Sequence, residues 1–154
     1  MSHVARLTGL CALALAGCMA APEPKGARDP KVPIASQVDV TAARLKGDWV
    51  VRASWTETAK AGERITLRLG GGGALWLGDI ALKPQGQGRF GGAGGVPEWW
   101  VLWLDHDNRT AAIGTPGGEF GWIMDRAPKG GADRIRAAKQ IMQWSGYDMA
   151  RMKE

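Results

Sequence analysis

Apolar and polar residues alternate with a period of two along several short stretches of the chain, which is typical of half-buried β-strands. In residues 47–55, GDWVVRASW, one side of the predicted strand carries Trp49, Val51, Ala53 and Trp55. Other short apolar or mixed segments predict strands within residues 64–69, 74–82, 98–105, 109–115 and 119–126, and a weak strand within residues 85–95; residues 98–105 are apolar on both faces. Gly and Pro turn signals separate the segments, so we expect a series of antiparallel hairpins.

Only one segment follows the helical period clearly. Residues 132–145, ADRIRAAKQIMQWS, place an apolar stripe on one face, and Gly146 is a fitting helix stop. The stripe consists of Ile135, Ala138, Ile141, Met142 and Ser145. A short helical turn is expected at residues 40–45. Residues 37–154 are therefore predicted to form an all-β domain with one C-terminal helix, and strands in this order close most easily into an up-and-down antiparallel barrel.

The first residues have the features of a bacterial lipoprotein signal. Arg6 precedes an apolar stretch at residues 7–16, which is too short to span a bilayer but suits a signal peptide. Residues 15–18, LAGC, match a lipobox, so we expect residues 1–17 to be a signal peptide and Cys18 to be acylated, which would attach the chain to a membrane. The alternative is an ordinary secretory signal with an accidental cysteine.

The residues after the lipobox fit a membrane tether. Residues 18–36 contain four Pro and little apolar periodicity, which favours an extended linker. Met19, rather than an Asp, follows Cys18, and this favours the outer membrane, with the protein facing the periplasm. Cys11 lies inside the predicted signal, so the mature chain has no second thiol for a disulfide.

Composition and charge narrow the function classes. Gly accounts for 23 of the 154 residues, about twice the usual share, which favours β structure with many turns. The net charge of +5 comes from scattered residues, so it is weak evidence for nucleic-acid binding. His106, the only His of the mature chain, lies between Asp105 and Asp107 and is expected in a solvated turn. We expect no cofactor, no metal site and no enzyme activity.

Three motifs, in order, resemble those of the lipocalin family. Gly47-Asp48-Trp49 looks like the G-x-W motif that opens the first lipocalin strand. Leu104-Asp105-His106 is similar to the second motif, T-D-Y, and residues 122–126, WIMDR, resemble the third, an apolar strand that ends in Arg. With the lipobox and the terminal helix, the set resembles the bacterial, apolipoprotein-D-like lipocalin lipoproteins over roughly residues 37–150.

The resemblance implies a plug at one end of the barrel. In lipocalins the motif Trp lies at the closed end with the third-motif Arg across it, which here pairs Trp49 with Arg126. A guanidinium over an indole ring is attractive, and Gly47 would allow the backbone to approach closely. We expect Gly47, Trp49, Asp105 and Arg126 to have this structural role.

The resemblance also implies an apolar lumen that holds one small hydrophobic ligand, such as a fatty acid (palmitate) or a lysophospholipid. With Trp49 pointing inward, Val51, Ala53 and Trp55 should follow, and Trp100, Leu102 and Leu104 are expected inward on the next long strand. Trp99, Val101 and Trp103 would then meet the helix. The expected ligand-binding residues are Trp55, Trp100, Leu102, Phe120, Trp122 and Met124.

Two departures from the family pattern bear on the pocket. Leu104 and His106 replace the Thr and Tyr of the second motif. The chain between Trp49 and Trp122 only just accommodates the strands of a lipocalin barrel, so the middle strands are expected to be short. Storage or transport of a hydrophobic ligand is the first functional hypothesis. The alternatives are a structural or interaction lipoprotein whose barrel is filled by side chains, and a lipocalin-fold enzyme.

Overall fold

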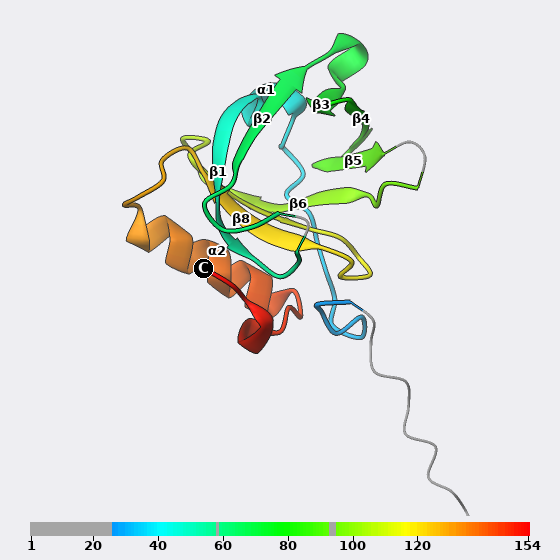
Figure 1. The fold of residues 1–154 in the computed structure, drawn as a ribbon. Coiled ribbons are helices and arrows are strands. Elements are labelled where there is room, and N and C mark those ends of the chain that lie inside the picture. Colours follow the sequence, from blue (N-terminus) through cyan, green and yellow to red (C-terminus); the bar gives the residue numbers. More distant parts are fainter. Residues whose placement is uncertain (1–25, 58, 93–94) are drawn as a thin grey trace, which may run out of the picture.

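The computed structural model describes residues 26–57, 59–92 and 95–154, and its strands form one closed antiparallel barrel (Figure 1). Each strand pairs with the next, and the last pairs with the first. The strands are β1 (Gly47–Ser54), β2 (Arg64–Leu69), β3 (Leu75–Leu77), β4 (Ile80–Gly86), β5 (Arg89–Gly92), β6 (Trp99–Leu104), β7 (Thr110–Gly114) and β8 (Gly121–Asp125). The helical elements are α1 (Ala42–Leu45), η1 (Gly71–Gly73), α2 (Ala132–Trp144) and η2 (Met149–Arg151). The predicted fold class is confirmed.

The middle of the barrel is built from short strands, as predicted. The apolar segment 74–82 is not one strand but a tight hairpin, because Gly78 adopts a φ of +56° and turns the chain between β3 and β4. β3 has 3 residues and β5 has 4. β3 pairs with β2 only from Leu67 to Leu69. Residues 64–66 of β2 therefore have no partner in β3, and the barrel wall is short at this point.

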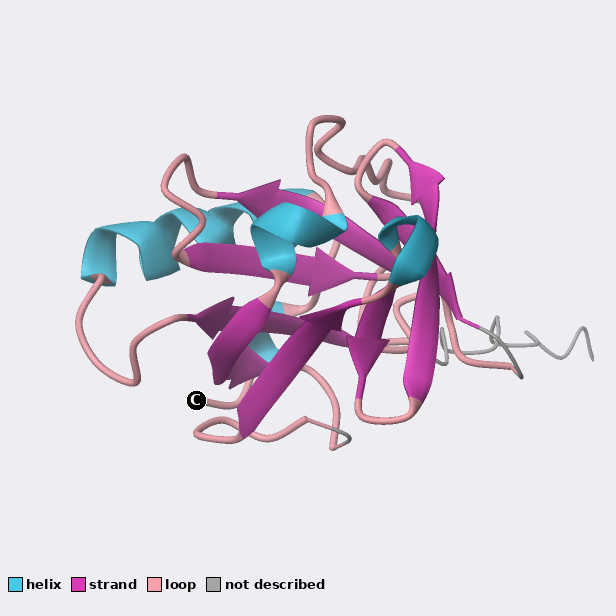
Figure 2. Ribbon diagram, turned by 90° about the horizontal axis from the view of Figure 1, so that it is seen from above, coloured by secondary structure: helices cyan, strands magenta, loops and turns pink. Residues whose placement is uncertain are grey.

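Two apolar clusters lie on opposite sides of the sheet. One fills the barrel and includes Trp49, Phe90, Trp99 and Met124. The other lies between the outer face of the sheet and α2, and it contains Ile135, Ala138 and Met142 from the predicted helix stripe. Figures 1 and 2 both show α2 outside the ring of strands. The contact with α2 explains why β6 is apolar on both faces.

Two β-bulges change the register that the alternation predicted. The pairing of β1 with β8 shifts between Val51 and Ala53, so the side chains beyond the shift exchange faces. Val51 belongs to the interior cluster as expected, whereas Ala53 and Trp55 pack on the α2 side, and the expectation that these two face the lumen is wrong. A period-two pattern cannot reveal an extra residue inside a strand.

The second bulge lies in β6, between Val101 and Trp103. Before it, Trp99 and Val101 point inward and Trp100 packs on the α2 side, which is the reverse of the prediction. After it, Leu104 faces the interior and Trp103 the outer cluster, as predicted. Leu102 lies at the shift itself and belongs to the outer cluster, so its predicted inward orientation is also wrong.

A buried ion pair fixes the start of α2 to the barrel. Asp125 is fully buried at the end of β8, and it accepts hydrogen bonds from the Thr110 hydroxyl and the backbone N–H of Ala127. Arg134 of α2 lies 3.2 Å from the same carboxylate and donates to Thr110 Oγ1 at 2.8 Å. A buried carboxylate needs such partners, so removing Arg134 would leave Asp125 with a desolvated charge.

The chain before the barrel is more ordered than an extended tether. Residues 26–36 run along the protein, and Arg28 is buried there with its guanidinium donating to the carbonyls of Val32, Pro116 and Ser145. Arg28 also forms a β-bridge with Tyr147. The expected tether, residues 18–36, therefore includes a packed part. Residues 18–25, and the predicted signal peptide with Cys18, lie outside the described residues.

Tyr147, the only Tyr of the chain, holds the segment after α2 against the turn between β7 and β8. Its hydroxyl donates to the Phe120 carbonyl at 2.7 Å and accepts from the Thr115 N–H at 3.0 Å. The ring fits against two glycines: a Cβ at Gly114 or Gly121 would lie within 2.5 Å of Tyr147 atoms. Burial raises the pKa of the hydroxyl to about 12.

We predict that this raised pKa makes stability fall in strong alkali. The folded state favours the neutral phenol, so its contribution is complete below the unfolded pKa of about 10 and is lost as the pH rises towards about 12, by roughly 2–3 kcal/mol. Chemical denaturation at increasing pH measures this loss. Tyr147→Phe should be less stable at neutral pH, by about 1–3 kcal/mol, and should lack this part of the alkaline decline. Identical pH dependence in both proteins would contradict the assignment.

Candidate functional site

The closed end of the barrel is sealed by Trp49 and Arg126, which we call the plug. The Arg126 guanidinium carbon lies 3.6 Å from the centre of the Trp49 ring, and the indole N–H donates to the Leu45 carbonyl at 2.7 Å. Arg126 also donates to the carbonyls of Asn108 at 3.1 Å, Asp48 at 3.1 Å and Arg44 at 3.3 Å. The predicted Trp49–Arg126 contact is present, and it ties α1, β1 and the β6–β7 turn together.

Gly47 is needed for this packing. It adopts a φ of +104°, which side-chain-bearing residues rarely adopt, and a Cβ there would lie 3.0 Å from Arg126 Nη1. The plug thus depends on the first residue of the Gly47-Asp48-Trp49 motif as well as the last. Burial lowers the pKa of Arg126, while the nearby Asp48 and Asp125 raise it in part.

Asp105 organises the turn that supports Arg126. Its carboxylate accepts hydrogen bonds from the backbone N–H groups of Arg109 and Thr110 and pairs with the Arg109 side chain at 3.2 Å. Burial raises the pKa of this carboxyl, but these hydrogen bonds and the charge of Arg109 outweigh burial and lower it overall. His106 is exposed beside it. Asp105 therefore shapes the turn as a structural residue.

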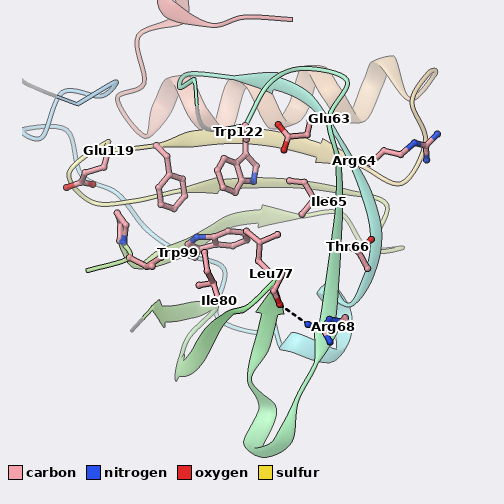
Figure 3. A pocket seen from close by; sticks show the side chains of 15 residues that line it. Glu63, Arg64, Ile65, Thr66, Arg68, Leu77, Ile80, Trp99, Glu119 and Trp122 are labelled. Carbon is pink, nitrogen blue, oxygen red and sulfur yellow. Dashed lines mark hydrogen bonds between the residues drawn. The ribbon is translucent and has the colours of Figure 1, made fainter. Parts of the chain in front are cut away.

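The other end of the barrel contains a cavity of about 790 Å³, within the range of small-molecule sites. Its apolar lining includes Ile65 of β2 and Leu77 of β3, together with Trp99, Phe120 and Trp122 (Figure 3). The remaining lining residues are Ala59, Glu63, Arg64, Thr66, Arg68, Gly78, Ile80, Val96, Pro97 and Glu119. Several of these are solvent-exposed, so the cavity opens to the surface where the β3–β4 hairpin is short.

Three aromatic side chains form the rigid wall of this cavity. Trp99 meets Trp122 edge-on, with ring centres 5.0 Å apart, and Phe120 stacks on Trp122 at 4.8 Å. Trp99 and Phe120 are 5.9 Å apart. Figure 3 shows Trp99 and Trp122 next to one another in this wall. Such mutual packing holds the rings in place before any ligand enters, and it presents flat apolar surface.

Charged side chains of both signs surround the cavity mouth. Glu63, Arg64 and Arg68 come from β2 or its preceding loop, and Glu119 comes from the β7–β8 turn. Arg68 donates to the Gly78 carbonyl at 2.7 Å, and Glu119 accepts from the Thr115 hydroxyl at 2.6 Å. An apolar interior with a rim of mixed charge suits an amphipathic molecule whose polar end remains near solvent.

The structure divides the residues predicted to bind ligand into two groups. Phe120 and Trp122 line the cavity. Met124 faces the interior and is fully buried, but it does not line the cavity. Trp55, Trp100 and Leu102 lie in the outer cluster instead. The Trp55 indole donates to the Asp148 carbonyl at 2.8 Å, and Arg89 stacks over Trp100 at 3.9 Å, so both have structural contacts outside the barrel.

Sequence reasoning missed Trp99, Ile65, Leu77 and Ile80 as cavity residues. The inward position of Trp99 was missed because β6 contains a bulge, and its inward side could be assigned only from the family resemblance. Ile65 alternates correctly with the exposed Arg64 and Thr66, so the pattern in β2 could have indicated its inward position. Leu77 and Ile80 flank the β3–β4 turn, which was not recognised within residues 74–82.

The described residues contain neither a candidate metal site nor a candidate membrane-spanning helix. They contain no group of three or more His, Cys, Asp or Glu side chains that could hold a metal ion. Within the same residues, no helix is both long and apolar enough to cross a bilayer.

We predict that Trp49→Ala destabilises the domain by about 3–5 kcal/mol, because it removes a buried indole and leaves a cavity beneath Arg126. Urea denaturation measures the loss. Trp144→Ala is a matched control, since Trp144 is 69% exposed, and it should change stability by less than about 0.5 kcal/mol. A loss below about 1 kcal/mol for Trp49→Ala would contradict the plug's role.

Comparison with known proteins supports the fold assignment for the C-terminal part of the chain. Residues 92–154 match the sequence model of the lipocalin-like domain family. No curated protein matches the chain. The matched residues include β6, β7, β8 and α2, and hence Arg126 of the plug and the aromatic wall of the cavity. The match supports the lipocalin family, and the closed eight-stranded barrel with its C-terminal helix is consistent with the lipocalin fold.

Proposed function

We propose that this protein is a lipid-anchored bacterial lipocalin that binds one small hydrophobic ligand for storage or transport at the outer membrane. The observation that carries the proposal is the cavity of about 790 Å³ beside Trp99, Phe120 and Trp122, at the end opposite the plug. A barrel filled by its own side chains, as in the structural-lipoprotein alternative, would leave no space of this size. The cavity therefore favours ligand binding.

A fatty acid or a lysophospholipid fits the chemistry of the cavity. Burial of an acyl chain against the apolar wall would stabilise the complex by roughly 25 cal/mol per Å² of apolar surface removed from water. At the mouth, Arg64 and Arg68 can meet a carboxylate or phosphate. Glu63 and Glu119, which also line the cavity, suit a headgroup that also carries positive charge.

We further propose that acylated Cys18 holds the protein on the outer membrane, facing the periplasm. The lipobox at residues 15–18 and Met19 after it support this placement. Two or more acyl chains on one residue attach a protein stably to a membrane, whereas a single chain does not. An anchored barrel is then close to the lipids that serve as its ligands.

We predict that palmitate or a lysophospholipid changes the intrinsic Trp fluorescence of delipidated protein with a saturable dependence on concentration. Trp122→Phe should lose much of the change, because Trp122 lines the cavity and Phe keeps the packing against Phe120. Trp100→Phe is the matched control and should keep it, since Trp100 lies on the outer side beneath Arg89. No change with any apolar ligand would refute the binding function.

The anchor is tested separately from the cavity. We predict that the wild-type protein, expressed in a bacterium that processes lipoproteins, fractionates with the outer membrane and carries acyl chains detectable by mass spectrometry. Cys18→Ala should lack the acyl mass and the cleavage after residue 17, because the modified thiol is absent. Membrane attachment of a correctly cleaved but unacylated protein would show that the lipobox interpretation is wrong.

A further inference from the structure

We propose that the outer surface at the C-terminal end of α2, with Trp144 at its centre, docks on the lipid bilayer to which the protein is anchored. The inference rests on the proposed acylation of Cys18. It adds a second contact with the membrane, made by the folded domain, and so fixes how the barrel is oriented. We call this surface the docking surface, and it comprises exposed Trp144 with the segment at Arg28 and Asp29, which hydrogen-bonds to the Ser145 and Gly146 carbonyls.

Trp144 is the first observation. It is the last residue of α2 and is 69% exposed, although Trp is among the most costly side chains to leave in water. The seven other Trp residues of the chain are all buried or half-buried. An indole combines an apolar body with one N–H donor, and it therefore favours the boundary between lipid headgroups and acyl chains.

The second observation is where the chain leaves the domain. The Arg28 side chain donates to the carbonyl of Ser145, the residue after Trp144, at 2.8 Å. The N–H of Asp29 donates to the Gly146 carbonyl at 2.8 Å, and Arg151 donates to the Gly26 carbonyl at 2.7 Å. In Figure 1 the start of the described chain lies beside the end of α2. The exit point is thus fixed next to Trp144.

Chain length turns this proximity into a constraint. Between Cys18 and Gly26 the backbone reaches at most about 30 Å, even fully extended. A domain tethered so closely spends much of its time against the bilayer, and the face nearest the exit point meets the lipid first. That face presents Trp144. The short tether therefore keeps the exposed Trp144 indole at a high effective concentration beside the bilayer, which favours its insertion.

The charges indicate how the contact is made. Lys31 and Arg151 are exposed near the exit point, but so are Asp29 and Asp148, so this region has little net charge. Attraction to anionic headgroups is then a minor contribution. Insertion of the Trp144 indole is the main one, and the contact should depend only weakly on salt.

Docking would also bring the cavity mouth near the membrane. Gly118, in the turn between β7 and β8, accepts a hydrogen bond from Ala27 at 2.7 Å, and Glu119 and Phe120 of the same turn line the cavity. The exit point and the mouth therefore lie at the same end of the barrel. A lipid leaving the bilayer would have a short path into the cavity.

The test uses acylated protein reconstituted in vesicles of phosphatidylethanolamine and phosphatidylglycerol, with and without brominated acyl chains that quench Trp fluorescence on contact. We expect brominated vesicles to quench the wild-type protein, Trp144→Phe to lose most of that quenching, and Trp76→Phe, which removes a half-buried indole on β3, to keep it. Quenching that is unchanged in Trp144→Phe, or absent in vesicle-bound wild-type protein, would overturn the docking surface.

A second measurement is independent of the indole. The mature acylated chain would have no free thiol, so Trp144→Cys and Val38→Cys each introduce a single site for a fluorophore at positions of nearly equal exposure, 69% and 71%. Nitroxide headgroup lipids should quench the probe at 144 much more than at 38, and equal quenching would overturn the orientation. Flotation separates the two proposals: protein that does not float refutes the anchor and the docking with it, whereas protein that floats without quenching at 144 refutes the docking alone.

Discussion

The contact between Arg126 and Trp49 is the constraint on which the rest of the barrel depends. It joins the end of β8 to the start of β1, the two strands that must meet for the sheet to close. Arg126 also holds carbonyls from α1 and from the turn before β7. Closure at this end is achieved with few residues because Gly47 lets the guanidinium approach the backbone. The opposite end needs no such seal and is free to form a cavity.

Most of the fold follows from local chemistry in the sequence. Alternation in β1, the helical stripe of α2 and the Gly and Pro turn signals were sufficient to predict antiparallel strands, a terminal helix and a barrel. The plug required more, since nothing in the pattern brings residue 49 to residue 126, and only the resemblance of the ordered motifs supplied the pairing. Local periodicity thus determines the elements, whereas contacts between distant residues determine how they close.

The cavity was harder to predict because its residues depend on register. One extra residue in β1 and one in β6 exchange the faces of Trp55 and Trp100, and β6 is apolar on both sides. Where both faces are apolar, a wrong register produces no buried charge or exposed patch to reveal the error. β8 has no such shift in its pairing with β7, and there Trp122 was assigned correctly.

The bulges also account for the position of α2. Each lets its strand turn apolar side chains outward where the helix packs, so Ala53 and Leu102 meet Ile135, Ala138 and Met142 without removing Val51 or Val101 from the interior. The C-terminal end of α2 is in turn held by Tyr147, whose hydroxyl bonds to the Phe120 carbonyl beside the cavity wall. Arg28 attaches the incoming chain to the same place. Hydrogen bonds therefore join the helix end, the cavity mouth and the exit of the chain into one connected unit.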